Sequence, residues 1–516
     1  MSPGGVRATC MARAALSLIA LGLFCSLATA HELWIEHVTV VSPERLKPLR
    51  DVTVYIRDDR IASISHRPPE RARGSEAGTE IIDGRGLYLT PGLIDSHVHT
   101  GLAPGMLPRH EEAHPDIARA AREQVPRSYL YFGFTTLVDL DSGPAQIAKW
   151  NAHATHPDMY FCGATPIVDG YPTMWAPESE RYQHPYLLVQ RGEESTAPEG
   201  IDPAAHTPEA LVARMKADGA FCVKTFYDER NFGKNDNVRV PRLDTIRELV
   251  RAAHAARMPV FIHALSTEAQ EFALETGADI IAHGLWHWNG EPDATALTPR
   301  VRKVLDGVLK RGLGWQPTFQ VGYGFRDLFD PRYLSNPLLA RVLPAALIEW
   351  HRTPEGQSFR DQTGSSFIPR SIAETGDAEA QWDWVRSFYE KSFGPLTLTM
   401  KYLAMHDARL LFGTDTPSAP LYTNPPGLNG WMEMHRLIEA GLTPAQIFRA
   451  ATLSNAEALA LSHEIGTVQA GKRANLLLLR EDPTQSIEAY NKIVIVILRG
   501  RALERSVLAA NPDSLN

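Results

Sequence analysis

Short apolar runs alternate with amphipathic segments through the middle of the chain. These runs predict eight strands, which end near Ser96, Leu140, Ile167, Phe226, His263, Ala282, Thr318 and Thr414. Between two of them, residues 244–256 carry apolar side chains at helical spacing. Because strands that alternate with helices form βα units, the pattern predicts an α/β fold with a TIM-type (β/α)8 barrel.

The two ends of the chain contain strand patterns without helices between them. Alternating residues predict strands at 34–41, 52–64, 475–479 and 493–498, with a tight turn at 57–60. We therefore expect a small β-sandwich domain formed from both chain termini. The expected boundaries are 31–88 for its N-terminal part, 89–463 for the barrel and 464–516 for its C-terminal part.

A long connection separates the seventh and eighth predicted strands. Residues 322–400 fall within it, whereas connections in α/β units usually have about two to six residues. The segment contains Trp350, Trp382 and Trp384. We interpret it as a lid or substrate-binding insertion, with the alternative that these tryptophans belong to a hydrophobic core.

The first thirty residues have the pattern of a secretory signal peptide. Arg7 and Arg13 precede an apolar run at 14–27, and Ala28-Thr29-Ala30 matches a cleavage site. A retained N-terminal anchor is the alternative. We expect a periplasmic or secreted protein without a membrane span in its mature form, since no later run approaches about 18 apolar residues.

Charge and cysteine content narrow the range of partners. The formal net charge of −8 disfavours nucleic acid and anionic membranes, which leaves a small-molecule substrate; homo-oligomerisation stays open. Cys162 and Cys222 remain after the signal peptide and could form one disulfide in an oxidising compartment. They have no CxxC spacing, so they do not indicate a zinc finger.

Histidines follow several of the predicted barrel strands. His97 and His99 end the first strand at a spacing that places both imidazoles on one face. His263 and His283 directly follow the fifth and sixth apolar runs. Imidazole is a good ligand for zinc, and the carboxyl ends of the strands are where TIM barrels hold their active sites.

Two further side chains fit the same centre. Asp415 follows the last strand, where a carboxylate can bind metal and take a proton from metal-bound water; a helix N-cap is the alternative. Lys224 ends the fourth strand. A free ammonium cannot bind metal, but a lysine carbamate could bridge two ions. Otherwise Lys224 forms a salt bridge or binds a substrate carboxylate, with one metal ion at the site.

Five motifs in this order resemble the amidohydrolase superfamily. They are LTPGLIDSHVHTG, CVKTFYD, VFIHA, IIAHG and LLFGTD. The nearest resemblance is to imidazolonepropionase-like hydrolases and metal-dependent dipeptidases, over residues 51–501. The segment GTVQAGKRANLLLL also resembles the C-terminal strand pair of that family, although Asn475 stands where an Asp is usual.

The resemblance implies one zinc ion, or two divalent ions if Lys224 is carboxylated. The implied ligands are His97, His99 and Asp415 at a buried ion, His263 and His283 at a more exposed one, and Lys224 between them. Asp415 is implied as general acid and base, with His283 also catalytic. The implied reaction is attack of metal-activated hydroxide on an amide, cyclic amide or dipeptide-like substrate, which makes the chain an amidohydrolase enzyme acting on carbon–nitrogen bonds other than ordinary protein peptide bonds.

Other functions stay open at this level. The chain could be a lactone or ester hydrolase, or a non-catalytic periplasmic binding protein on the same barrel. His110 to His114 formally match HExxH, but Pro115 disfavours helix at His114, so we predict a loop rather than a metalloprotease site. Tyr227 could orient a substrate carbonyl and Arg230 could bind a carboxylate, although both also fit ordinary loop positions.

Overall fold

Seven parallel strands form the central sheet in the computed structural model, which describes residues 31–67, 79–177, 180–231, 234–289, 294–418 and 420–511. The expected signal peptide, residues 1–30, lies outside this range. In spatial order the strands are β14 (Gly314–Gln316), β13 (Ile280–Ala282), β12 (Val260–Ala264), β9 (Cys222–Tyr227), β8 (Asp158–Thr165), β7 (Phe134–Asp139) and β6 (Leu93–Val98). Such an unbroken order of parallel neighbours is typical of a TIM-like barrel.

The expected eighth strand is not a regular strand. Residues 409–416 hydrogen-bond to β14 on one side and to β6 on the other, through Leu411 N to Trp315 O and Ser96 N to Phe412 O. Side chains take the place of further backbone acceptors, because Phe412 N donates to Asn455 and Thr414 N donates to the Asp95 carboxylate. The segment therefore lies at both edges of the sheet, but the parallel sheet of the described residues has seven regular strands where eight were predicted.

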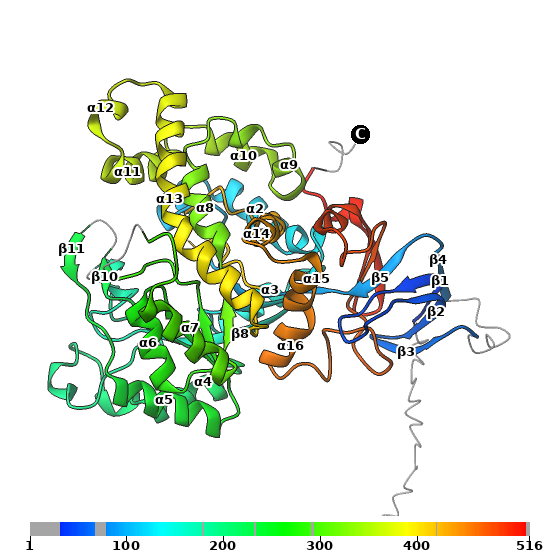
Figure 1. Cartoon of the computed structure of the whole chain (residues 1–516), viewed down its shortest axis with the longest axis horizontal. Coiled ribbons are helices and arrows are strands. Elements are labelled where there is room, and N and C mark those ends of the chain that lie inside the picture. Colours follow the sequence, from blue (N-terminus) through cyan, green and yellow to red (C-terminus); the bar gives the residue numbers. More distant parts are fainter. Residues whose placement is uncertain are drawn as a thin grey trace, which may run out of the picture.

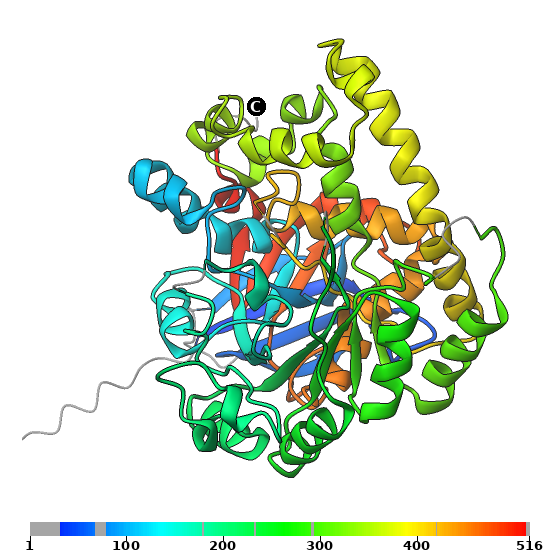
Figure 2. The same cartoon turned by 90° about the vertical axis from the view of Figure 1, so that its left-hand side faces the viewer.

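Helices lie around the parallel strands (Figure 2). They are α2 (Pro115–Tyr131), α3 (Pro144–Asn151), α4 (Pro208–Ala217), α5 (Leu243–Ala255), α6 (Thr267–Thr276), α7 (Pro299–Arg311), α14 (Leu428–Glu439), α15 (Pro444–Arg449) and α16 (Asn455–Ala458). Local sequence sets their ends. The Ser266 hydroxyl caps α6 by accepting from Ala269 N, and Gly277 ends the helix at a φ of 87°.

Strands from both ends of the chain pair in a second, mixed sheet. Its order is β17 (Arg501–Glu504), β16 (Ile493–Leu498), β15 (Leu476–Leu479), β5 (Tyr88–Pro91), β1 (Glu32–Val40), β2 (Leu49–Arg57) and β3 (Arg60–Ser65), with β4 (Thr79–Asp83) beside β1. Figure 1 shows these N- and C-terminal strands together at one side of the molecule. The predicted turn at 57–60 is confirmed by the β2–β3 hairpin. A sandwich of two facing sheets, and the domain boundaries, stay predictions.

Six helices form the insertion after β14. They are α8 (Phe319–Asp327), α9 (Leu339–Val342), α10 (Ala345–His351), α11 (Ser358–Phe367), α12 (Arg370–Ala373) and the long α13 (Ala378–Met405). Helix α13 packs against α7 and α8, which ties the insertion to the barrel (Figure 1). Trp350 and Trp382 are buried in the main hydrophobic core. These two tryptophans therefore stabilise the insertion by apolar packing.

Within the described residues, no helix combines the length and the apolar character needed to cross a membrane.

Candidate metal centre

Six predicted site residues gather at the carboxyl ends of the parallel strands. His97 lies in β6 and His99 follows it. Lys224 lies in β9, His263 in β12, His283 directly after β13, and Asp415 after the segment that joins β14 and β6. His283 and Asp415 have φ values of 77° and 56°, which is uncommon for side chains other than glycine and often marks a functional position.

Within this group, the carboxylate of Asp415 lies among three imidazoles. Asp415 Oδ1 is 2.9 Å from His99 Nε2 and 3.2 Å from His97 Nε2, while Asp415 Oδ2 is 3.9 Å from His283 Nδ1. One ligand atom each from His97, His283 and Asp415 can be chosen so that all lie within 4.8 Å of one another. No other such group of three occurs in the part of the chain that the structure describes.

The donor set fits a divalent metal ion. His97 is fully buried, yet among the described residues neither of its ring nitrogens has a hydrogen-bond partner with acceptable geometry. A buried polar atom without a partner is costly, and a metal ion would satisfy it. Burial lowers the pKa of His97 to about 3, which keeps its imidazole neutral, the form that binds metal. Burial alone would raise the pKa of Asp415, but the surrounding histidines hold it well below its usual value.

His263 and His283 form the other side of the centre. Their ring centroids lie 4.6 Å apart. His263 Nε2 is 3.2 Å from Asp228 Oδ2, and His283 Nδ1 is 3.0 Å from the Thr318 hydroxyl. Burial lowers the pKa of both imidazoles. Each of these neutral rings therefore has one nitrogen engaged by a neighbouring side chain and one left for a ligand.

Lys224 is buried, and its charge acts on His97, His263 and His283. Its side chain shares the inward face of β9 with Phe226, whose ring centroid lies 5.8 Å from Lys224 Nζ. Burial lowers the pKa of Lys224 to about 7, although the carboxylates of Asp415 and Asp141 act in the opposite direction. A substantial fraction of Lys224 is therefore a neutral amine near pH 7, and this is the form that reacts to give a carbamate.

The structure does not bring Tyr227 to this donor set. Tyr227 is three residues from Lys224, and the alternation of side chains along a strand turns it to the opposite face. Its hydroxyl donates to Glu268 of α6 at 3.1 Å. The backbone of Arg230 lies in the short strand β10 (Arg230–Asn231), and its side chain is outside the described part of the structure.

The HExxH match does not form a metal site among the described residues. The prediction of a loop is wrong for α1 (Pro108–Ala113), because Pro108 occupies the first helical turn, where proline favours a helix start. His114 lies between α1 and α2, so the two histidines do not share one continuous helix. His110 Nδ1 accepts from Leu107 N, and His114 pairs with Glu355 at 2.7 Å.

Sequence reasoning overlooked three residues that contact the histidines. They are Asp228, Thr318 and Tyr171, whose ring stacks on His263 with centroids 4.3 Å apart. Asp228 is part of the CVKTFYD motif and shares the strand parity of Lys224, which could have indicated it. Thr318 and Tyr171 carry no such signal, because the segments around them show no regular alternation of apolar and polar residues.

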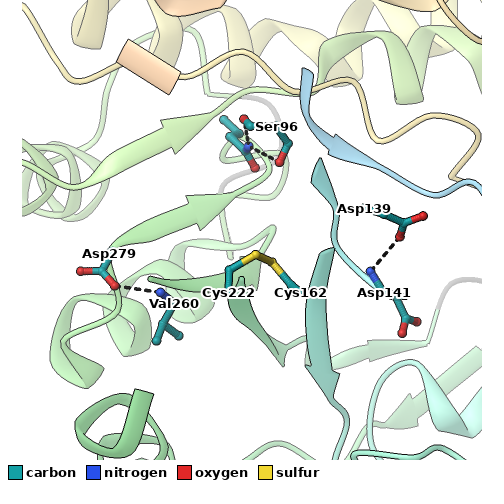
Figure 3. Close-up of a disulfide and its surroundings, with 8 residues drawn as sticks. Ser96, Asp139, Asp141, Cys162, Cys222, Val260 and Asp279 are labelled. Atoms are coloured by element: carbon teal, nitrogen blue, oxygen red, sulfur yellow. Dashed lines mark hydrogen bonds between the residues drawn. A yellow bond between two sulfur atoms is a disulfide. The ribbon is translucent and has the colours of Figure 1, made fainter. Parts of the chain in front are cut away.

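Cys162 and Cys222 form a disulfide inside the barrel wall (Figure 3). They are direct register partners on the neighbouring strands β8 and β9. Both are fully buried, and Cys222 lies two residues before Lys224 on the same face. The bond therefore links the strand that carries Lys224 to its neighbour, directly beneath the metal centre.

Comparison with known proteins gives a partial family match and a shared fold. Residues 399–503 match the model of the amidohydrolase family. A Xaa-Pro dipeptidase solved with bound methionine is 18% identical, with a TM-score of 0.59 over 92% of this chain and 100% of that chain. Ochratoxinase from A. niger is 16% identical (TM-score 0.61; 92% and 96%), and molinate hydrolase is 17% identical (0.61; 92% and 95%). No curated protein matches the chain in sequence.

The family match and the shared fold confirm the resemblance to the amidohydrolase superfamily. In its C-terminal match and in its fold the chain is therefore similar to hydrolases of the amidohydrolase family. This family is metal-dependent, and His97, His283 and Asp415 provide a possible metal site in this chain.

Proposed function

We propose that this protein hydrolyses an amide, cyclic amide or dipeptide-like bond in a small molecule, at a centre of one or two divalent metal ions. The observation that carries the proposal is the buried group of His97, His283 and Asp415, in which both nitrogens of His97 lack a hydrogen-bond partner within the described part of the chain. His99 completes the set around Asp415 at 2.9 Å. Zinc is the ion that this nitrogen-rich donor set favours.

Two of the predicted ligands, one of which also belongs to the buried group, would hold a second ion. His263 and His283 would bind it, and a carbamate on Lys224 would bridge both ions. The buried position of Lys224, whose charge acts on histidines at both proposed ions, supports this arrangement. If Lys224 stays an amine, one ion is held by the remaining groups. We also propose that residues 409–416 occupy the position of the eighth strand in the barrel, because they bring Asp415 to the same edge as the histidines.

When bound, the metal supplies Lewis acidity, which lowers the pKa of a water molecule from about 15.7 to about 7. Asp415 is placed to accept the proton of the attacking water, because its carboxylate is buried and held ionised. It then returns this proton to the leaving nitrogen, so that the carbon–nitrogen bond breaks and a carboxylic acid and an amine result. His283, 3.9 Å from Asp415 Oδ2, belongs to the same catalytic centre.

A substrate panel tests this reaction. The structural neighbours are named for acting on Xaa-Pro dipeptides, ochratoxin, molinate and phenylureas. We would assay the metal-loaded protein on these compounds, on cyclic amides and on lactones. Amine release that disappears in Asp415→Asn supports the proposal. Turnover of lactones alone would assign an ester hydrolase, and no turnover by a fully metal-loaded protein would favour the non-catalytic binding protein.

We further propose that the enzyme works in the periplasm or outside the cell. The disulfide between Cys162 and Cys222 supports this location, because such bonds persist in oxidising compartments and are rare in the cytosol. The signal-peptide pattern of residues 1–30 agrees with it. N-terminal sequencing of protein recovered from the periplasm tests the proposal, with His31 as the expected first residue.

A further inference from the structure

We infer that Asp228 is a positioning residue, which fixes the ring of His263 so that Nδ1 is the nitrogen presented to the metal centre. This inference rests on the metal site of the proposed function. Asp228 is buried, and its Oδ2 lies 3.2 Å from His263 Nε2. A nitrogen that donates to a carboxylate cannot also bind a metal, so only Nδ1 of His263 remains.

Strand geometry explains why Asp228 reaches this position. The strands β9 and β12 are parallel neighbours, with His263 opposite Phe226. Asp228 lies two residues beyond Phe226, so it belongs to the same inward face, one pleat closer to the mouth. The carboxylate therefore approaches His263 from the first residue after the adjacent strand β9.

Two ring contacts restrict His263 further. Tyr171 stacks on its imidazole at 4.3 Å with an interplanar angle of 26°, and His283 meets it edge-on at 4.6 Å. A 180° flip of the ring about its Cβ–Cγ bond would keep this plane, but it would place Cε1 instead of Nε2 opposite Asp228 and so break that contact. Tyr171 and His283 thus set the plane, and Asp228 sets which nitrogen faces inward.

The other candidate ligands lack an equivalent partner. His283 Nδ1 meets the neutral hydroxyl of Thr318, whereas His97 and His99 face Asp415, which is itself a proposed ligand. A carboxylate bonded to a ligating histidine raises the basicity of the ring as well as orienting it, and loss of such a partner costs about 10–100-fold in metal affinity. Asp228 should therefore raise the affinity for the ion at His263 more than the affinity for the ion at His97.

The test measures metal binding by full-length protein stripped of metal with a chelator. Zn²⁺ affinity is determined by competition with a chromophoric chelator, and Co²⁺ loading is followed by its visible absorption spectrum. We expect Asp228→Asn to lower the affinity for the ion at His263 by about 10-fold and Asp228→Ala to lower it by up to about 100-fold. The Co²⁺ spectrum should change in both variants. Asp228→Glu should recover part of the affinity.

Asp279→Asn is the matched control. It removes the same charge from another Asp–His pair, because Asp279 Oδ2 lies 2.9 Å from His254 Nε2, but this pair lies before β13, at the opposite end of the strands from the proposed ligands. It should leave the Co²⁺ spectrum unchanged. Asp228 variants that bind both ions as the wild type does, with an unchanged spectrum, would overturn the inference while leaving the proposed function intact. A wild type that binds no metal would instead overturn the proposed function.

Histidine ¹⁵N chemical shifts of the zinc-loaded wild type provide a second measurement that needs no Asp228 variant to fold. The inference predicts that His263 carries its proton on Nε2 and its metal on Nδ1. Coordination through Nε2 of His263 would contradict it.

Discussion

Asn475 donates its side-chain amide to Asp158 Oδ2 at 2.8 Å, which joins the start of β15 in the terminal sheet to the start of β8 in the barrel. Arg473 and Arg499 contact the same carboxylate at 2.8 Å. Burial opposes ionisation of Asp158, but these two guanidinium groups hold its pKa below the usual value. The departure from the usual Asp at position 475 is therefore explained, because an aspartate there would face a second carboxylate.

Asn475→Asp should destabilise the protein by about 1–3 kcal/mol near pH 7, since it replaces a hydrogen-bond donor to Asp158 with a like charge. Chemical unfolding measures this loss. The deficit should shrink as the pH falls and the new carboxylate is protonated. Asn475→Ala, which removes the donor without adding charge, is the control. An Asn475→Asp protein as stable as the wild type at pH 7 would contradict the argument.

Asp415→Asn should lower kcat by at least about 100-fold, because the amide cannot accept the proton of the attacking water. The far-ultraviolet circular dichroism spectrum should stay unchanged. Asp279→Asn, at the opposite end of the strands, should retain most of the activity. Retention of full activity by Asp415→Asn would remove this residue from the proton route.

Lys224→Met should reduce the metal content of the protein. Methionine keeps an apolar stem of similar length in the buried position but cannot form a carbamate. Elemental analysis of protein purified without chelator should give about two ions per wild-type chain and about one in the variant. Two ions in both proteins would show that Lys224 is no bridge. One ion in both would assign it as an ordinary side chain.

Glu433→Gln should change the pH dependence of stability. Glu433 is buried and accepts from Phe319 N at 3.0 Å and Gln320 N at 2.6 Å, at the start of α8. Burial raises its pKa from 4.5 to about 8. Because the folded state holds the proton more tightly, the contribution of Glu433 to stability is fully present below about pH 4.5 and is lost as the pH rises to 8.

Thermal unfolding between pH 4.5 and 8 measures this effect. The Tm of Glu433→Gln relative to the wild type should rise across the interval, because glutamine has no proton to lose. Glu390→Gln, at an exposed position of α13, should show no such trend. Parallel curves for the wild type and Glu433→Gln would argue that Glu433 does not titrate in this interval.

Positions that depend on chain periodicity could be predicted from the sequence. His97, His263 and Asp415 each follow an apolar run, and parallel strands bring their carboxyl ends together whatever the exact register. The β2–β3 hairpin could be predicted equally well, because Asp58 and Asp59 suit a tight turn.

Positions that depend on contacts between distant segments could not be predicted. Tyr227 was predicted as a loop residue, whereas it ends strand β9, whose alternation turns Phe226 inward instead. The irregular backbone at Thr414 follows from the carboxylate of Asp95, which lies far away in the sequence. The partnership of Thr318 with His283 depends on how the insertion begins, and local pattern does not reveal that.

The pairing of β5 with β15 also sets an order of events during folding. These strands are separated by most of the chain, so β1 to β5 cannot complete their sheet until β15 to β17 have been synthesised. Closing so long a loop is slow, since its entropy is lost before the contacts form. In the export proposed above, this terminal sheet would therefore be completed only after the last strands have crossed the membrane.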